Sequence, residues 1–264
     1  MPIISINNSE DERIAPFLGV RERDIIGRDH HFIAEGRVVI QLLLKSSYTT
    51  EALLICEKQR SFLEHIPAQI LETTPIYIAS QDIMNSIVGF PIHRGLLALG
   101  RKPLSPSPNQ FLNSLAEPKL VIGIIGLTNH DNMGGIFRNA ASFGCSAILL
   151  DQTCCDPFYR KALRVSVGGV LKVPFIQTGD SANLIDILEQ NQYQIFALSP
   201  AGTTLLSDIP NSGRNALLLG SEGPGLPKSV MERVTTVRIP MTANFDSLNV
   251  ATTSGIALYE MTKP

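Results

Sequence analysis

Apolar residues recur along the first hundred or so positions in short runs, some with the spacing of a helix and some typical of a buried strand. Residues 30–46 (HHFIAEGRVVIQLLLKS) place Phe32, Val39, Leu42 and Leu43 at helix-like intervals, which predicts a helix. The segments that follow predict short buried strands at 52–57, 75–80 and 95–101, and a helix at 81–89 that ends at its glycine. We therefore expect an α/β sandwich in this part of the chain.

A proline-rich stretch, residues 101–119 (RKPLSPSPNQFLNSLAEPK), separates this region from the rest. Pro103, Pro106 and Pro108 disfavour a regular helix or an interior strand, so the stretch predicts an extended linker. The expected organisation is a first domain at 1–102, a linker at 103–118 and a second domain at 119–264.

Strands and helices alternate more regularly after the linker. Apolar strands are expected at 119–127, 146–151, 194–200, 215–223 and 237–241, and helices at 134–144, 181–191 and 248–262. Continuous apolar strands that alternate with helices indicate a mainly parallel sheet covered on both faces. The predicted fold class is α/β throughout.

Composition is globular, with 44% hydrophobic and 17% charged residues over 264 positions. The net charge of −2 argues against a strongly basic surface that surrounds nucleic acid, although a local basic face could still bind RNA. The cysteines have no zinc-site spacing, so we expect free, partly buried thiols and no metal: Cys56, Cys145, Cys154 and Cys155. No signal peptide and no membrane-length apolar run is evident, so the expected location is the cytoplasm.

Ligands of parallel α/β sheets bind beyond the carboxyl ends of the strands, where three loops have unusual composition. The first, residues 129–139 (NHDNMGGIFRN), places Asn132 at the mouth of a helix and Arg138 further in. The two side chains could face one cleft. Equally, Asn132 could be a helix cap and Arg138 an ordinary surface residue.

The second loop, residues 217–227 (LLLGSEGPGLP), exposes backbone groups to a ligand because it is rich in glycine and proline, with Glu222 in its middle. An ordinary tight turn is the alternative. In the third segment, from residue 239 onward, Ser247 and Asn249 precede the last helix and could either cap it or contact a ligand.

A basic segment lies between the first two loops. Arg160, Lys161 and Arg164 suit phosphate contacts, although a solvated charged face is the commoner explanation. Asp151, at the end of the second strand of this half, matches the ribose-binding acid of a dinucleotide fold, but the glycine fingerprint of that fold is missing. P-loop, G-x-S-x-G and H-E-x-x-H patterns are also absent from the sequence.

Taken in order, the three loops resemble the motifs of the SpoU (TrmH-like) family of RNA ribose methyltransferases, within the SPOUT superfamily. The matching segments are 132–140, 219–226 and 239–250, with a further family-like segment at 164–169. The likeness covers residues 119–264. The first domain, with its Ala34-Glu35-Gly36 and His93-Arg94-Gly95 stretches, is similar to the ribosomal-protein-L30e-like substrate-binding domain of many members.

The resemblance implies an α/β-knot, a deep trefoil knot in the C-terminal domain, that binds S-adenosylmethionine. Matched by position, the cofactor contacts would be Leu198, Ser199, Gly220, Ser221, Glu222, Gly223, Ile239, Met241 and Leu248. Catalysis would fall to Arg138, supported by Asn132, Glu222, Ser247 and Asn249. Because a guanidinium is a poor base, Arg138 would stabilise the developing alkoxide, grip the adjacent phosphate, or act as a base assisted by that phosphate.

The resemblance also implies a homodimer formed through the C-terminal domain, with ribosomal or transfer RNA as the substrate. The implied reaction moves a methyl group to a ribose 2′-hydroxyl. Two alternatives remain open at this point: an RNA-binding protein of the same fold without turnover, and a methyltransferase that acts on an RNA base.

Overall fold

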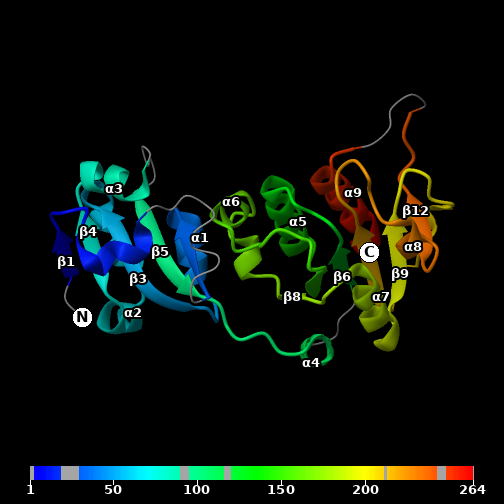
Figure 1. The fold of residues 1–264 in the computed structure, drawn as a ribbon, viewed down its shortest axis with the longest axis horizontal. Helices are drawn as coiled ribbons and strands as arrows, with labels where there is room; N and C mark the ends of the chain where they lie inside the picture. Colours follow the sequence, from blue (N-terminus) through cyan, green and yellow to red (C-terminus); the bar gives the residue numbers. More distant parts are fainter. Residues whose placement is uncertain are drawn as a thin grey trace. The chain divides into compact units, whose positions relative to one another are not determined.

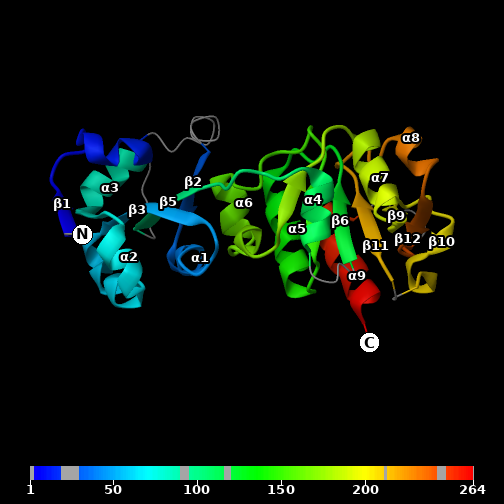
Figure 2. The same cartoon turned by 90° about the horizontal axis from the view of Figure 1, so that it is seen from below.

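The computed structural model describes residues 3–18, 30–89, 95–115, 120–210, 213–242 and 248–263. The chain divides into two compact units, Met1–Leu104 with Asp156–Lys172, and Ser105–Cys155 with Val173–Pro264. Residues 156–172 therefore belong to the first unit, although they lie within the second domain expected from the sequence. Figure 1 and Figure 2 show the elements of each unit.

The first unit is built on a five-stranded mixed sheet of order β1-β4-β3-β5-β2. Its strands are β1 (Ile3–Ile6), β2 (His31–Glu35), β3 (Thr49–Cys56), β4 (Ile76–Ala79) and β5 (Leu96–Arg101). Strands β1, β4 and β3 run parallel, whereas β5 is antiparallel to both β3 and β2. The α-helices are α1 (Arg37–Leu43), α2 (Ala68–Thr73), α3 (Gln81–Val88) and α6 (Arg160–Val165), and the 3₁₀ helices are η1 (Glu12–Phe17), η2 (Glu57–His65) and η3 (Gly169–Leu171).

The helix expected at residues 30–46 is wrong in its first half. Residues His31–Glu35 form the edge strand β2, and only Arg37–Leu43 is helical. Gly36 separates the two, because its φ of 89° is a conformation that side-chain-bearing residues rarely adopt. Strand β2 is buried over most of its length, so the apolar run carries no alternation that would distinguish a strand from a buried helix.

The second unit contains a seven-stranded sheet of order β10-β12-β9-β11-β6-β7-β8. Its strands are β6 (Leu120–Ile124), β7 (Ala147–Leu150), β8 (Phe175–Gln177), β9 (Gln194–Leu198), β10 (Thr204–Leu205), β11 (Asn215–Leu219) and β12 (Thr235–Arg238). Every pairing between them is parallel, as predicted. The helices are α4 (Pro108–Ser114), α5 (His130–Ser142), α7 (Ser181–Gln190), η4 (Leu206–Asp208), α8 (Lys228–Met231) and α9 (Val250–Thr262).

Helices cover both faces of this sheet (Figure 1, Figure 2). On one face, apolar residues of α4, α7 and α8 share a core with strand residues such as Val121, Leu149 and Leu218. Helices α5 and α9 pack against each other on the opposite face. Gly135 of α5 allows this close approach, since a Cβ there would lie 2.6 Å from the Cβ of Ala251 on α9.

Helix α4 contradicts the expectation that the proline-rich stretch is an extended linker. Pro108 occupies the first helical turn, where its missing N–H costs no hydrogen bond. Ser107 caps the helix by accepting from the Gln110 backbone N–H at 3.3 Å, while Gln110 Oε1 accepts from the Ser107 N–H at 3.1 Å. Residues 116–119, the end of the expected linker, lie outside the described part of the chain.

No helix among the described residues is long and apolar enough to cross a membrane. The trefoil knot and the L30e-like character of the first unit stay predictions.

Candidate functional site

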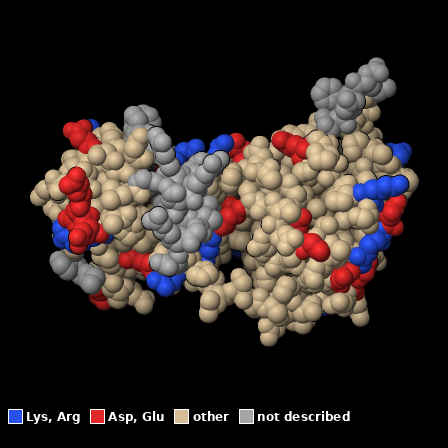
Figure 3. All heavy atoms as spheres, in the orientation of Figure 1, with Lys and Arg blue, Asp and Glu red and all other residues tan. Residues whose placement is uncertain are grey.

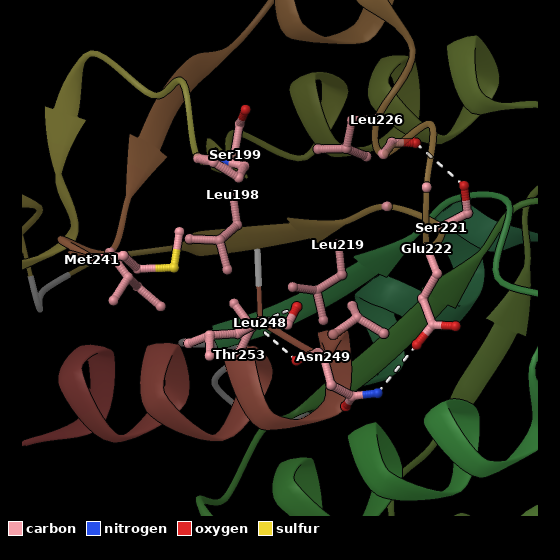
Figure 4. A pocket seen from close by; sticks show the side chains of 16 residues that line it. Leu198, Ser199, Leu219, Ser221, Glu222, Leu226, Met241, Leu248, Asn249 and Thr253 are labelled. Atoms are coloured by element: carbon pink, nitrogen blue, oxygen red, sulfur yellow. Dashed lines mark hydrogen bonds between the residues drawn. The ribbon is translucent and has the colours of Figure 1, made fainter. Parts of the chain in front are cut away.

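A pocket of about 540 Å³ opens at the carboxyl ends of β9, β11 and β12 (Figure 4). This volume falls in the range of small-molecule sites, and the position is where parallel α/β sheets bind ligands. The pocket is formed by the loops after these strands and by the first turn of α9. Its lining residues are Leu198, Ser199, Pro200, Leu219, Gly220, Ser221, Glu222, Gly223, Gly225, Leu226, Ile239, Met241, Leu248, Asn249, Val250 and Thr253.

The loop after β11 folds back sharply on itself. Ser221 and Gly225 form an isolated antiparallel bridge, and the Ser221 hydroxyl donates to the Gly225 carbonyl at 3.4 Å. A Cβ at Gly220 would lie 2.5 Å from the Gly225 carbonyl carbon, so only glycine fits there. Gly223 and Gly225 adopt φ values of 87° and 68°. The glycines thus allow a tight loop whose backbone groups border the pocket with little side-chain obstruction.

Three polar side chains from distant parts of the chain meet beside the pocket. Asn132 Nδ2 donates to Glu222 Oε1 at 2.5 Å, and Asn249 Nδ2 donates to the same oxygen at 3.1 Å. Asn249 Nδ2 also donates to Asn132 Oδ1 at 2.8 Å. This amide–carboxylate cluster, Asn132, Glu222 and Asn249, connects helix α5, the loop after β11 and the start of helix α9.

Asn249 has a second role as the N-cap of α9, because its Oδ1 accepts from the backbone N–H groups of Ala251 at 2.9 Å and Thr252 at 3.2 Å. The capping and ligand interpretations of this residue are therefore compatible. The capping interpretation of Asn132 is wrong: the cap of α5 is Asn129, and Asn132 lies buried within the helix.

Arg138 lies on a different face of α5 from Asn132. Its side chain is exposed, it does not line the pocket, and it forms no ion pair with any residue that the structure describes. A single chain therefore does not bring the predicted catalytic arginine to the pocket. Ser247 falls within residues 243–247, outside the described residues.

Every residue predicted to contact a cofactor lines the pocket, and so do Glu222 and Asn249 of the predicted catalytic set. Their roles stay predictions. The sequence interpretation missed Pro200, Leu219, Gly225, Leu226, Val250 and Thr253 as lining residues. Most of them lie inside or beside the same three motifs, and Thr253 follows Asn249 by about one helical turn, so helical spacing could have indicated it.

The basic segment forms helix α6, where Arg160 Nη1 donates to Glu35 Oε2 at 2.7 Å. Glu35 is 5% exposed, and Arg164 lies 4.0 Å from the same carboxylate oxygen. The Arg160 charge is thus compensated inside the first unit. On the face that Figure 3 shows, Lys and Arg are interspersed with Asp and Glu. The proposed phosphate contacts of Arg160, Lys161 and Arg164 stay a prediction.

Asp151 is buried and its carboxylate is already engaged. Oδ1 accepts from the Gly126 and Thr153 backbone N–H groups, both at 3.1 Å. This carboxylate fixes two loops and does not border the pocket.

Burial raises the pKa of the Cys154 thiol to about 12, and that of Cys145 likewise to about 12. All four cysteines are free, as expected.

Residues 119–259 match the model of the SpoU rRNA Methylase family. An uncharacterized tRNA/rRNA methyltransferase of Mycobacterium bovis is 37% identical, covering 88% of this chain and 80% of its own length. The 23S rRNA (guanosine-2'-O-)-methyltransferase RlmB of Acinetobacter baylyi is 30% identical, covering 69% of this chain and 75% of its own.

Among solved structures, the AdoMet-bound rRNA methyltransferase from Sinorhizobium meliloti superposes with a TM-score of 0.84 at 21% identity. The match covers 98% of this chain and 97% of that one, which shows a shared fold. The fold and its pocket define an α/β protein with a small-molecule site at the carboxyl end of a parallel sheet. The chain belongs to the SpoU rRNA Methylase family.

Proposed function

We propose that this protein transfers the methyl group of S-adenosylmethionine to a ribose 2′-hydroxyl of ribosomal or transfer RNA. The observation that carries the proposal is that the three motifs converge on one pocket, with the amide–carboxylate cluster at its side. The name of the relative RlmB, a guanosine-2'-O-methyltransferase of 23S rRNA, supports the ribose as acceptor. The cytoplasm, where such RNA is abundant, is part of the proposal.

The pocket fits a nucleoside-like cofactor. Leu198, Ile239, Met241 and Leu248 supply apolar surface of the kind that packs on a planar base. Gly220 must be glycine, because a Cβ there has no room. With no side chain in the way, the backbone groups of this loop can hydrogen-bond base and sugar edges. S-adenosylmethionine, when bound, supplies a methyl group activated by a sulfonium.

Arg138 is the proposed catalytic residue. Methyl transfer requires an aligned acceptor oxygen and stabilisation of the negative charge that develops on it. A guanidinium stays protonated, so Arg138 would act as a cation toward the alkoxide or the neighbouring phosphate of RNA rather than as a simple base. Its exposed side chain is available for such a contact.

We further propose a homodimer through the second unit, in which a second copy completes the site that one chain leaves without an arginine. Helix α9 presents two large apolar side chains on one exposed face, Ile256 at 41% and Tyr259 at 63% exposure. Tyr259 also contacts Phe143 edge-to-face, with ring centroids 6.4 Å apart. Tyr259→Glu is expected to shift the protein from dimer to monomer in light scattering. A wild-type monomer, or a variant dimer of unchanged affinity, contradicts this interface.

The proposed function is tested by pairing a binding assay with a transfer assay. Arg138→Ala should bind S-adenosylmethionine with affinity close to that of the wild type but lose transfer of labelled methyl to RNA. Arg233→Ala is the control, because Arg233 pairs with Asp186 and Glu189 away from the pocket. Wild-type-like turnover by Arg138→Ala refutes the role of the arginine. Failure of the wild-type protein to bind the cofactor refutes the function itself.

A further inference from the structure

The pocket carries one formal charge on the residues that the structure describes. Of those that line it, Glu222 alone has an ionisable side chain, and the others are apolar, glycine, or neutral and polar. Glu222 forms no ion pair with any described residue. Its only side-chain partners there are the amides of Asn132 and Asn249.

These partners hold the carboxylate without cancelling its charge. Both amides donate to Oε1, and neutral amide dipoles leave the net charge of −1 in place. They are themselves fixed, because Asn249 caps helix α9 and Asn132 lies buried in helix α5. Glu222 is therefore a preorganised negative charge at the wall of the pocket, and because the residue is exposed, solvent and salt screen its attraction in part.

Such a charge distinguishes two ligands that differ mainly in charge. If the pocket holds S-adenosylmethionine, as proposed above, it must also release S-adenosylhomocysteine, which lacks the methyl group and the positive charge of the sulfonium. We propose that Glu222 makes the pocket select the cationic donor over the neutral thioether product. Methyl transfer removes the positive charge from the bound cofactor. The pocket then binds the product more weakly than the donor, which favours product release.

A purely structural role for Glu222 has a different consequence. If the residue served only to tie the loop after β11 to α5 and α9, its loss would weaken every ligand of the pocket to a similar extent. Glu222→Gln separates the two roles, because the amide retains the size and one oxygen acceptor but removes the charge.

The experiment measures calorimetric affinities for S-adenosylmethionine, S-adenosylhomocysteine and sinefungin, in which a protonated amine on carbon replaces the methylated sulfonium. Glu222→Gln should weaken both cationic ligands by about threefold to fivefold at low salt, and S-adenosylhomocysteine by less than about twofold. Glu222→Asp, which keeps the charge, should retain preference for the cations. Glu232→Gln is the matched control, an exposed carboxylate at the C-cap of α8 and outside the pocket.

Equal weakening of the three ligands, or no weakening, overturns the proposal. A measurement on the wild type keeps the test independent of folding of the variants: the affinity ratio of donor to product should fall as ionic strength rises, since the pocket is open to solvent. A ratio that does not respond to salt contradicts the role of the charge. Failure of all three ligands to bind the wild type refutes the proposed function instead.

Discussion

Gly135→Ala tests the close packing of helices α5 and α9. An added Cβ would lie 2.6 Å from the Ala251 Cβ, whereas carbon atoms in contact prefer about 3.5–4.0 Å, so the helices would have to separate by roughly 1 Å. Overpacking of this kind costs about 1–3 kcal/mol. Without the clash, alanine within a helix would stabilise the protein by about 1 kcal/mol relative to glycine. Overpacking therefore predicts a less stable variant, whereas helix propensity alone predicts a more stable one.

Moving α5 and α9 apart would also disturb the pocket, because the 2.8 Å hydrogen bond from Asn249 to Asn132 joins these two helices. We expect Gly135→Ala to lower the free energy of unfolding in urea by about 1 kcal/mol, which is the overpacking cost less the helix gain, and to weaken cofactor binding. Adding Ala251→Gly removes the opposing methyl group. The double variant should be more stable than the sum of the single changes by about 1–2 kcal/mol. A stabilised Gly135→Ala, or strictly additive changes, refutes the packing argument.

Other contacts give predictions of the same kind. Asn139→Ala should cost about 1–2 kcal/mol in denaturant unfolding, because its amide donates to the Ala251 carbonyl at 2.7 Å and to the Ser254 hydroxyl at 2.9 Å, both part-buried bonds; a cost below about 0.3 kcal/mol contradicts their role. Arg160→Ala should cost about 3 kcal/mol, because the buried Glu35 carboxylate would keep only the more distant Arg164, and Arg164→Ala should cost under about 1 kcal/mol; equal costs would contradict the assignment. Cys154, with its pKa raised to about 12, holds little thiolate at pH 8 and should react with iodoacetamide far more slowly in the native than in the unfolded protein; mass spectrometry showing fast native labelling argues otherwise.

The inner strands of the second unit could be predicted because they are covered on both faces, whereas the short and partly exposed strands β8 and β10 lie outside the predicted strands. Strands such as β6 (Leu120–Ile124) and β11 (Asn215–Leu219) are buried at every position, and buried parallel strands appear in sequence as continuous apolar runs. Helices between these runs leave a parallel sheet as the simplest arrangement.

The errors have local causes. The helix predicted at 30–46 includes strand β2 because only three residues, Glu35, Gly36 and Arg37, separate its apolar run from that of α1, too few to show where one element ends; the conformation of Gly36 separates the two. Helix α4 differs from the predicted linker because Pro108 stands directly after the capping Ser107, at the helix start, where proline does not break a helix. Both outcomes depend on single residues at element boundaries, where sequence patterns carry the least information.

The site could be predicted as a set of residues but not as a geometry. The residues predicted to contact a cofactor all line the pocket, since strand ends of a parallel sheet meet at one edge. The bond between Asn132 and Glu222 joins residues far apart in the sequence, and no spacing rule predicts it. The outward position of Arg138 likewise follows from which face of α5 packs on α9 and the sheet, which the tertiary structure decides.

The central claim is most directly tested by locating the transferred methyl group. Purified protein would be incubated with S-adenosylmethionine bearing a deuterated methyl group and RNA from cells that lack the protein, and the digested nucleosides analysed by mass spectrometry. The account predicts deuterated methyl on the ribose 2′-oxygen of one or a few nucleosides, absent with Arg138→Ala. Label on a base, or no label in any nucleoside, contradicts it.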